Sequence, residues 1–82
     1  MARPLPTGGG KIEALSDVMY DVVTELYNCS TAVDALDMYI DDAKKANDQQ
    51  ALQAFEQMRA DELRHCDMLR AIIRNQVQQG TF

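Results

Sequence analysis

The chain has 82 residues, of which 46% are hydrophobic and 26% charged, and its formal net charge is −5 at pH 7. This length allows one small domain, and the acidic balance excludes the clustered basic surface that nucleic-acid binding requires. No stretch approaches the roughly 20 apolar residues of a membrane span, and no signal-peptide pattern opens the chain, so we expect a cytoplasmic protein that binds no membrane.

The chain begins with a tail and continues as a long helix. Residues 1–10 (MARPLPTGGG) contain both prolines and three of the four glycines, which predicts a flexible segment. From residue 11 to residue 79 there is neither Gly nor Pro, which favours long helices. Apolar residues then repeat at steps of three and four, which predicts a straight helix over about 11–46 in coiled-coil-like packing. The repeating positions are Ile12, Leu15, Met19, Val22, Leu26, Cys29, Val33, Leu36, Ile40 and Ala43.

A brief turn and a second helix follow. Asn47 suits the left-handed conformation that ends a helix, and Asp48 can cap the next one, which we expect over about 48–79 with Gly80 as its stop. Because the turn is so short, the helices must fold back antiparallel. Two helices leave wide apolar faces uncovered. The predicted fold is therefore all-α, an antiparallel hairpin over 11–80 that dimerises into a four-helix bundle, as a homodimer or a higher homo-oligomer.

Two polar residues interrupt the apolar stripe of the second helix. The stripe runs Phe55, Met58, Glu62, His65, Leu69 and Ile72. Burying a carboxylate and an imidazole costs roughly several kcal/mol unless something compensates. Glu62 and His65 also form a Glu-x-x-His motif, which helical di-iron proteins project into a bundle core. The pattern predicts a metal site; the alternative is a hydrogen-bonded Glu62–His65 pair that only fixes the helix register.

The expected helix pairing limits the ligands that one chain can supply. Around a turn near Asn47, residues whose numbers sum to about 94 should face one another. The expected pairs are Glu62 with Ala32, His65 with Cys29, and Phe55 with Tyr39. The nearest carboxylate of the first helix is then Glu25, two turns away. A two-fold axis that brings together two copies of Glu62 and His65 would supply four ligands.

The two cysteines are expected to be free thiols. Cys29 lies in the seam of the first helix, whereas Cys66 follows His65 and should point towards the flank. An axis separation of about 8–10 Å leaves little room for a disulfide, and the cytoplasm is reducing. Cys29 is a secondary candidate for a metal ligand.

From Ala35 to Met68 the chain resembles the ferritin-like superfamily, and more narrowly the encapsulated ferritins. The specific residues of this resemblance are Tyr39, Glu62 and His65. In that family a two-helix subunit dimerises to complete a di-iron ferroxidase centre. The resemblance implies iron as the bound metal, with manganese and zinc as alternatives, and these three residues as its ligands.

The chain also departs from the family. A liganding glutamate precedes the family's tyrosine by seven residues, and Ala32 occupies that position here. Either Glu25 or Cys29 substitutes, or the ferroxidase activity is weakened or lost. The final residues, Gln79 to Phe82, lack the family's encapsulin-targeting tail and so do not support an encapsulating shell. Two functions are therefore expected: an iron-binding protein with an inter-subunit site, or a metal-free helical assembly module.

Overall fold

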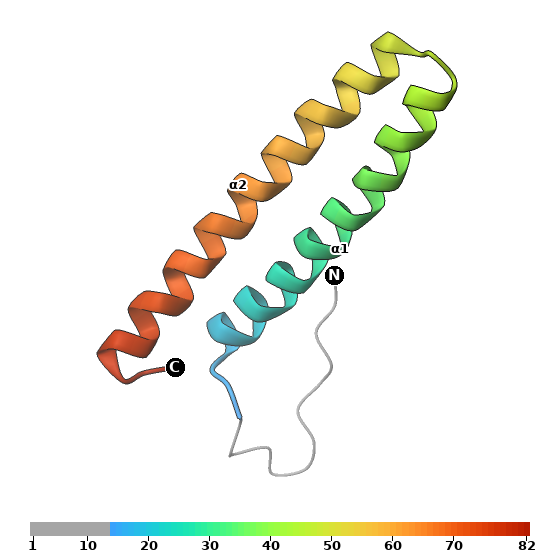
Figure 1. Cartoon of the computed structure of the whole chain (residues 1–82). Helices are drawn as coiled ribbons and strands as arrows, with labels where there is room; N and C mark the ends of the chain where they lie inside the picture. The colour runs from blue at the N-terminus through green and yellow to red at the C-terminus, as the bar shows by residue number, and fades with distance from the viewer. Residues whose placement is uncertain (1–13) are drawn as a thin grey trace.

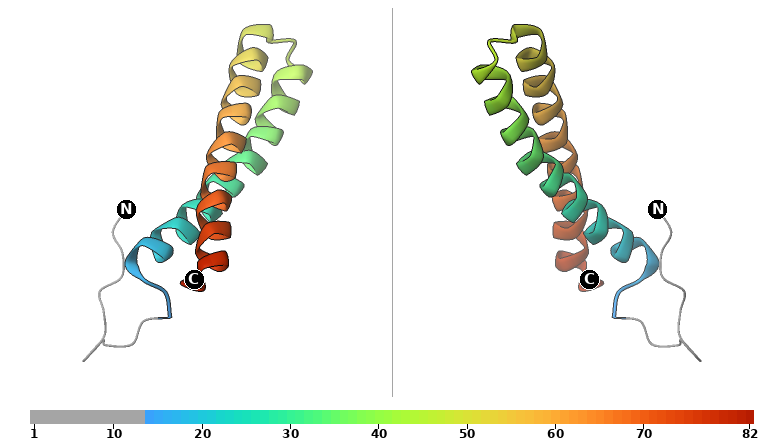
Figure 2. Two further views of the ribbon diagram at one scale, coloured as in Figure 1. Left: turned by 90° about the vertical axis from the view of Figure 1, so that its left-hand side faces the viewer. Right: turned by 90° about the vertical axis from the view of Figure 1, so that its right-hand side faces the viewer.

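The computed structural model describes residues 14–82, which form two long helices joined by a tight turn (Figure 1). Helix α1 is Asp17–Lys45 and helix α2 is Gln49–Gln79. The two helices lie side by side and run antiparallel, and the described part of the chain contains no strand (Figure 2). The predicted all-helical hairpin is confirmed. The expected tail over residues 1–10, and the expected helical residues 11–13, lie outside the described residues.

Helix α1 begins later than its apolar repeat indicates. The side chain of Ser16 accepts a hydrogen bond from the backbone N–H of Met19 at 3.2 Å, and Ser16 itself has an extended backbone. The first helical residue is therefore Asp17, whose charge suits the positive end of the helix dipole. Leu15 belongs to the apolar repeat but precedes the helix, so periodicity alone placed the start too early.

The turn and the caps match the predicted ones. Asn47 has a positive φ of 55°, in the left-handed region that asparagine tolerates. Asp48 caps α2 by accepting a hydrogen bond from the N–H of Ala51 at 2.9 Å. At the far end of α2, Gly80 has a φ of 73° and its N–H donates to the carbonyl of Val77 at 3.1 Å.

The core lies between the helices and is small. In α1 every buried residue belongs to the predicted stripe. These residues are Met19, Val22, Cys29, Leu36 and Ala43. In α2 only Cys66 is buried, and half-buried Phe55, Arg59, Glu62 and Leu69 share its side of the helix.

The predicted seam of α2 is correct for only half of its members. Phe55, Glu62 and Leu69 are half-buried, whereas Met58 is 52% exposed and Ile72 is 38% exposed. His65 is exposed as well. The face of α2 that packs against α1 is centred on Cys66, one residue later than predicted, because a small apolar thiol fits a close helix pair better than an imidazole does.

Large apolar side chains remain exposed on both helices. They include Val18, Tyr20, Val23, Tyr27, Met38 and Tyr39 on α1, and Met58, Leu63, Met68, Ile72 and Val77 on α2. Neither helix is long and apolar enough to cross a membrane, in the part of the chain that the structure describes. The apolar surface therefore exceeds what one hairpin can cover by itself.

Candidate metal site at the Glu62–His65 pair

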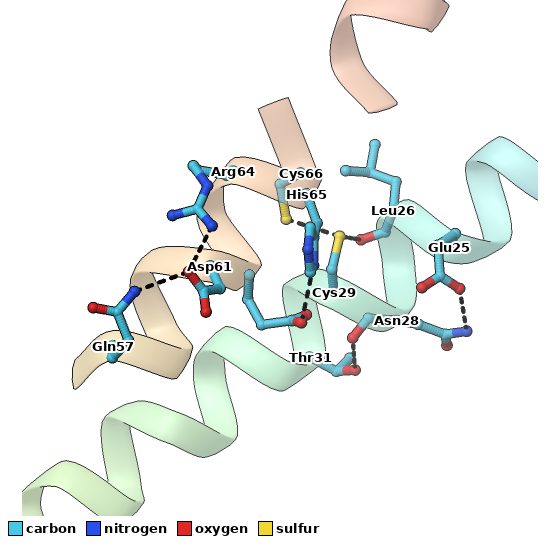
Figure 3. Close-up of polar contacts among 11 residues, drawn as sticks. Glu25, Leu26, Asn28, Cys29, Thr31, Gln57, Asp61, Arg64, His65 and Cys66 are labelled. Carbon is cyan, nitrogen blue, oxygen red and sulfur yellow. Dashed lines mark hydrogen bonds and ion pairs between the residues drawn. The ribbon is translucent and has the colours of Figure 1, made fainter. Parts of the chain in front are cut away.

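Glu62 and His65 lie one helical turn apart on α2 and contact each other. The Nδ1 atom of His65 and the Oε1 atom of Glu62 are 3.1 Å apart, as the dashed line from His65 shows in Figure 3. The side chain of Glu62 is 27% exposed and that of His65 is 53% exposed. The predicted burial of His65 in mid-seam is therefore wrong, because Cys66 takes that position, whereas Glu62 keeps its place in the seam and is half-buried.

The separation of these two donor atoms suits a single metal ion. Metal–nitrogen and metal–oxygen bonds of about 2.1 Å, at a right angle to each other, place their donor atoms about 3.0 Å apart. The observed 3.1 Å is close to that spacing. The same distance is also that of an ordinary hydrogen bond between the imidazole and the carboxylate. The geometry thus fits either use of the pair.

Tyr39, the third residue of the resemblance, lies elsewhere in the hairpin. Its ring stacks obliquely on Phe55 with centroids 5.6 Å apart and an interplanar angle of 51°, so the expected Tyr39–Phe55 pair is confirmed. Both rings line a shallow pocket beside the turn, together with Ala43 and Ala51. Phe55 precedes Glu62 by two helical turns, or about 10 Å along α2. Within one chain, Tyr39 therefore lies away from the Glu62–His65 pair.

Neither Glu25 of α1 nor Asp61 of α2 joins the pair. Glu25 is exposed on α1 and accepts a hydrogen bond from the side-chain amide of Asn28 at 3.4 Å (Figure 3). Asp61 accepts from the Gln57 amide at 3.0 Å and pairs with Arg64 at 2.6 Å, and these two contacts lower its pKa. Across residues 14–82, no three His, Cys, Asp or Glu side chains form a group that could hold a metal ion. Within this part of the chain, a metal ion at the pair would therefore have only Glu62 and His65 as ligands.

Cys29 faces Cys66 rather than His65, which corrects the expected pairing. Both thiols are buried and their sulfur atoms are 2.9 Å apart (Figure 3). Burial, the Cys66 thiol and the negative charge of Glu62 raise the pKa of Cys29 to about 11. A thiol must lose its proton to bind a metal well, so Cys29 is a poor ligand at neutral pH. The expectation that Cys66 points to the flank is wrong, because the face of α2 that packs against α1 is centred on Cys66 and not on His65.

Ala32 and His65 lie on the same side of the hairpin. Along the helix, Ala32 is turned about 60° from Cys29, and His65 is turned about 100° from Cys66 in the same sense. In antiparallel helices, rotations of the same sense away from facing residues lead to the same side. Residues seven positions apart lie on nearly the same side of an α-helix, so Tyr39 follows Ala32 on α1, and Met58 and Ile72 flank His65 on α2. We define the open face as Ala32, Tyr39, Met58, His65 and Ile72.

One contact between the helices was not anticipated from the sequence. The Nε atom of Arg59 lies 2.6 Å from Oδ1 of Asp37, which links α2 to α1 one turn from Glu62. Arg59 is half-buried on the side of α2 that faces α1, and its guanidinium reaches the carboxylate across the hairpin. The Asp37–Arg59 pair could be predicted only from the exact register of the two helices, and the sequence does not fix that register to within one residue.

Comparisons with protein families, curated proteins and solved structures found no significant match to this chain. The resemblance to the encapsulated ferritins stays a prediction, which rests on Tyr39, Glu62 and His65.

Proposed function

We propose that the chain is a ferritin-like, iron-binding protein that acts as a homodimer, with the Glu62–His65 pairs of two chains forming one inter-subunit site. The observation that carries the proposal is the pair itself, with a carboxylate oxygen and an imidazole nitrogen 3.1 Å apart at the edge of an open face. The exposed side chain of His65 leaves it accessible to a second chain.

The open face supports a second copy of the chain as its partner. Tyr39 is 46% exposed, Met58 52% and Ile72 38%, and they share this face with His65 and the small Ala32. A patch of large and small apolar residues on a hairpin with so few buried side chains is what a second hairpin would cover in a four-helix bundle. A copy related by a two-fold axis would present the same face in return.

Charge supports a cation within that dimer. A second copy on the open face would bring two half-buried Glu62 carboxylates nearer to each other and further from water, and a bound cation or bound protons would compensate their repulsion. Two glutamates and two histidines form an oxygen and nitrogen ligand set that suits iron, manganese or zinc. Bound iron would supply redox chemistry. Because Ala32 supplies no carboxylate, we expect slow or absent ferroxidase turnover.

The metal and the dimer can be tested separately. Protein purified without chelators is analysed for bound metal and titrated with ferrous iron under anaerobic conditions, while light scattering reports its mass. We expect a dimer and Glu62-dependent metal, lost in Glu62→Gln and kept in the matched control Glu56→Gln, which alters an exposed glutamate of the same helix. Equal metal in both variants would end the metal-site proposal, and a monomer at micromolar concentration would end the dimer.

His65 offers a second readout because it is the only histidine of the 82-residue chain. Its imidazole nitrogen resonances can therefore be assigned without ambiguity. Adding zinc, a diamagnetic probe, should shift one of these resonances strongly in the wild type and leave both unchanged in Glu62→Gln. Unchanged resonances in the wild type at saturating zinc would show that the imidazole is no ligand.

The alternative function is a metal-free assembly module. The hydrogen-bonding distance between His65 Nδ1 and Glu62 Oε1 favours it, because the two side chains already satisfy each other within one chain. A stable dimer that binds neither ferrous iron nor zinc would establish this alternative over the metal site.

A further inference from the structure

Two thiols from different helices meet in the core of the hairpin. Cys29 of α1 is 2% exposed and Cys66 of α2 is 3% exposed, and their sulfur atoms lie 2.9 Å apart although 37 positions separate them in the chain. Both are free thiols in the structure, and Figure 3 shows the sulfurs directed towards each other between the helices. This pair has no part in the proposed metal site.

A metal site is the weaker use of this pair. Within residues 14–82 no third ligand joins the two cysteines, and the raised pKa of Cys29 keeps it protonated at neutral pH. Formation of a disulfide needs no third group. It needs two sulfurs that can come into bonding distance. The 2.9 Å between the facing thiols shows that the helix pair leaves more room for this bond than the expected axis separation indicated.

We propose that Cys29 and Cys66 are a redox modification site, at which a low-molecular-weight disulfide such as oxidised glutathione converts the two thiols into a reversible cross-link between α1 and α2. One cysteine thiolate attacks oxidised glutathione, which leaves a mixed disulfide and releases one glutathione. The second cysteine then attacks the cysteine sulfur of the mixed disulfide and releases the other glutathione. The protein loses two protons and two electrons, which convert one oxidised glutathione into two reduced ones.

Burial determines when the reaction proceeds. The thiols are covered by both helices, so oxidised glutathione reaches them when the hairpin opens locally, which a core of so few buried side chains allows. Once the mixed disulfide has formed, reclosing the hairpin holds the second thiol beside it, and the second step becomes intramolecular. The cross-link then closes a long loop of chain and stabilises the hairpin against unfolding.

Oxidation of the two cysteines would also affect Glu62 and His65, because these residues lie at the same position along the hairpin. Cys66 directly follows His65, and the charge of Glu62 already acts on Cys29. A covalent bond between the helices at this level would hold the backbone of both residues in one register. The reduced hairpin can open there, and the oxidised hairpin cannot.

The test uses the full chain, reduced and then incubated with excess oxidised glutathione. In the wild type we expect titratable thiols to fall from two to none per chain, with a monomeric chain on a non-reducing gel and no glutathione adduct in the intact mass. The thermal midpoint should rise by about 10 °C or more, and dithiothreitol should reverse every change.

Two variants separate this mechanism from ordinary modification of a cysteine. Cys29→Ser and Cys66→Ser each lack the second thiol, so each should stop at the mixed disulfide and retain one glutathione in its mass. Glutathione adducts or disulfide-linked dimers in the wild type would overturn the proposal. Unreacted thiols in the folded wild type, under conditions that oxidise the urea-unfolded chain, would overturn it equally.

Discussion

Raising the pH should destabilise the reduced hairpin through Cys29. Burial first, and then the Cys66 thiol and the Glu62 charge, raise the pKa of Cys29 from its ordinary 9.0 to about 11. The unfolded chain loses this proton near pH 9, while the folded chain holds it until about pH 11. The folded state therefore binds more protons in this window, and its stability falls as the pH rises through it.

The size of the effect follows from the pKa difference. Two pKa units correspond to about 3 kcal/mol in the free energy of unfolding, lost between about pH 9 and pH 11. Stabilities of small domains are typically about 5–15 kcal/mol, so such a loss would be a large share of the total. Below pH 9 the contribution is fully present, and the stability should vary little with this group.

The measurement is urea unfolding, followed by far-ultraviolet circular dichroism at several pH values with a phosphine reductant present. Cys29→Ser is the matched control, because a hydroxyl of similar size does not ionise in this range. Tyrosine and lysine residues titrate in both proteins and cancel in the difference between them. The wild type should lose about 3 kcal/mol more than the variant, and parallel pH profiles would refute the account of the buried thiol.

Three further perturbations test the cap, the inter-helix ion pair and the family resemblance. Asp48→Ala removes the cap on the N–H of Ala51 and should cost about 1 kcal/mol in urea unfolding. A double-mutant cycle on Asp37 and Arg59 should give a coupling energy below about 1 kcal/mol, because both side chains are more than a third exposed and water screens them. Ala32→Glu, which restores the carboxylate of the resemblance, should increase oxygen consumption after ferrous iron is added; no gain would show that the resemblance does not extend to the centre.

The fold could be predicted from the sequence because its determinants are local. The absence of Gly and Pro from residue 11 to residue 79 favours two long helices, and Asn47 and Asp48 identify the turn by their own backbone and side-chain preferences. The start of α1 was missed because an apolar repeat says nothing about where helical hydrogen bonding begins. Ser16 followed by Asp17 was the available signal.

The pairing of side chains across the hairpin was harder to predict than the helices. The Tyr39–Phe55 contact follows from counting outward from the turn, and the structure confirms it. The same count placed Cys29 opposite His65, and the structure places it opposite Cys66. A shift of one residue turns a helix by 100°, which moves a side chain from the core to the flank. Apolar periodicity cannot resolve this shift when both candidate rows contain apolar residues.

The stripe of α2 contains two rows that face different neighbours. Phe55, Glu62 and Leu69 turn towards α1, whereas Met58, His65 and Ile72 alternate with them and remain exposed. A helix that packs against two neighbours needs both rows, and a single 3-4 repeat merges them into one pattern. The Glu62–His65 pair spans the boundary between the rows, with its carboxylate half-buried beside α1 and its imidazole on the open face. This division between a position beside α1 and a position on the open face is the one that the proposed site between two subunits would require.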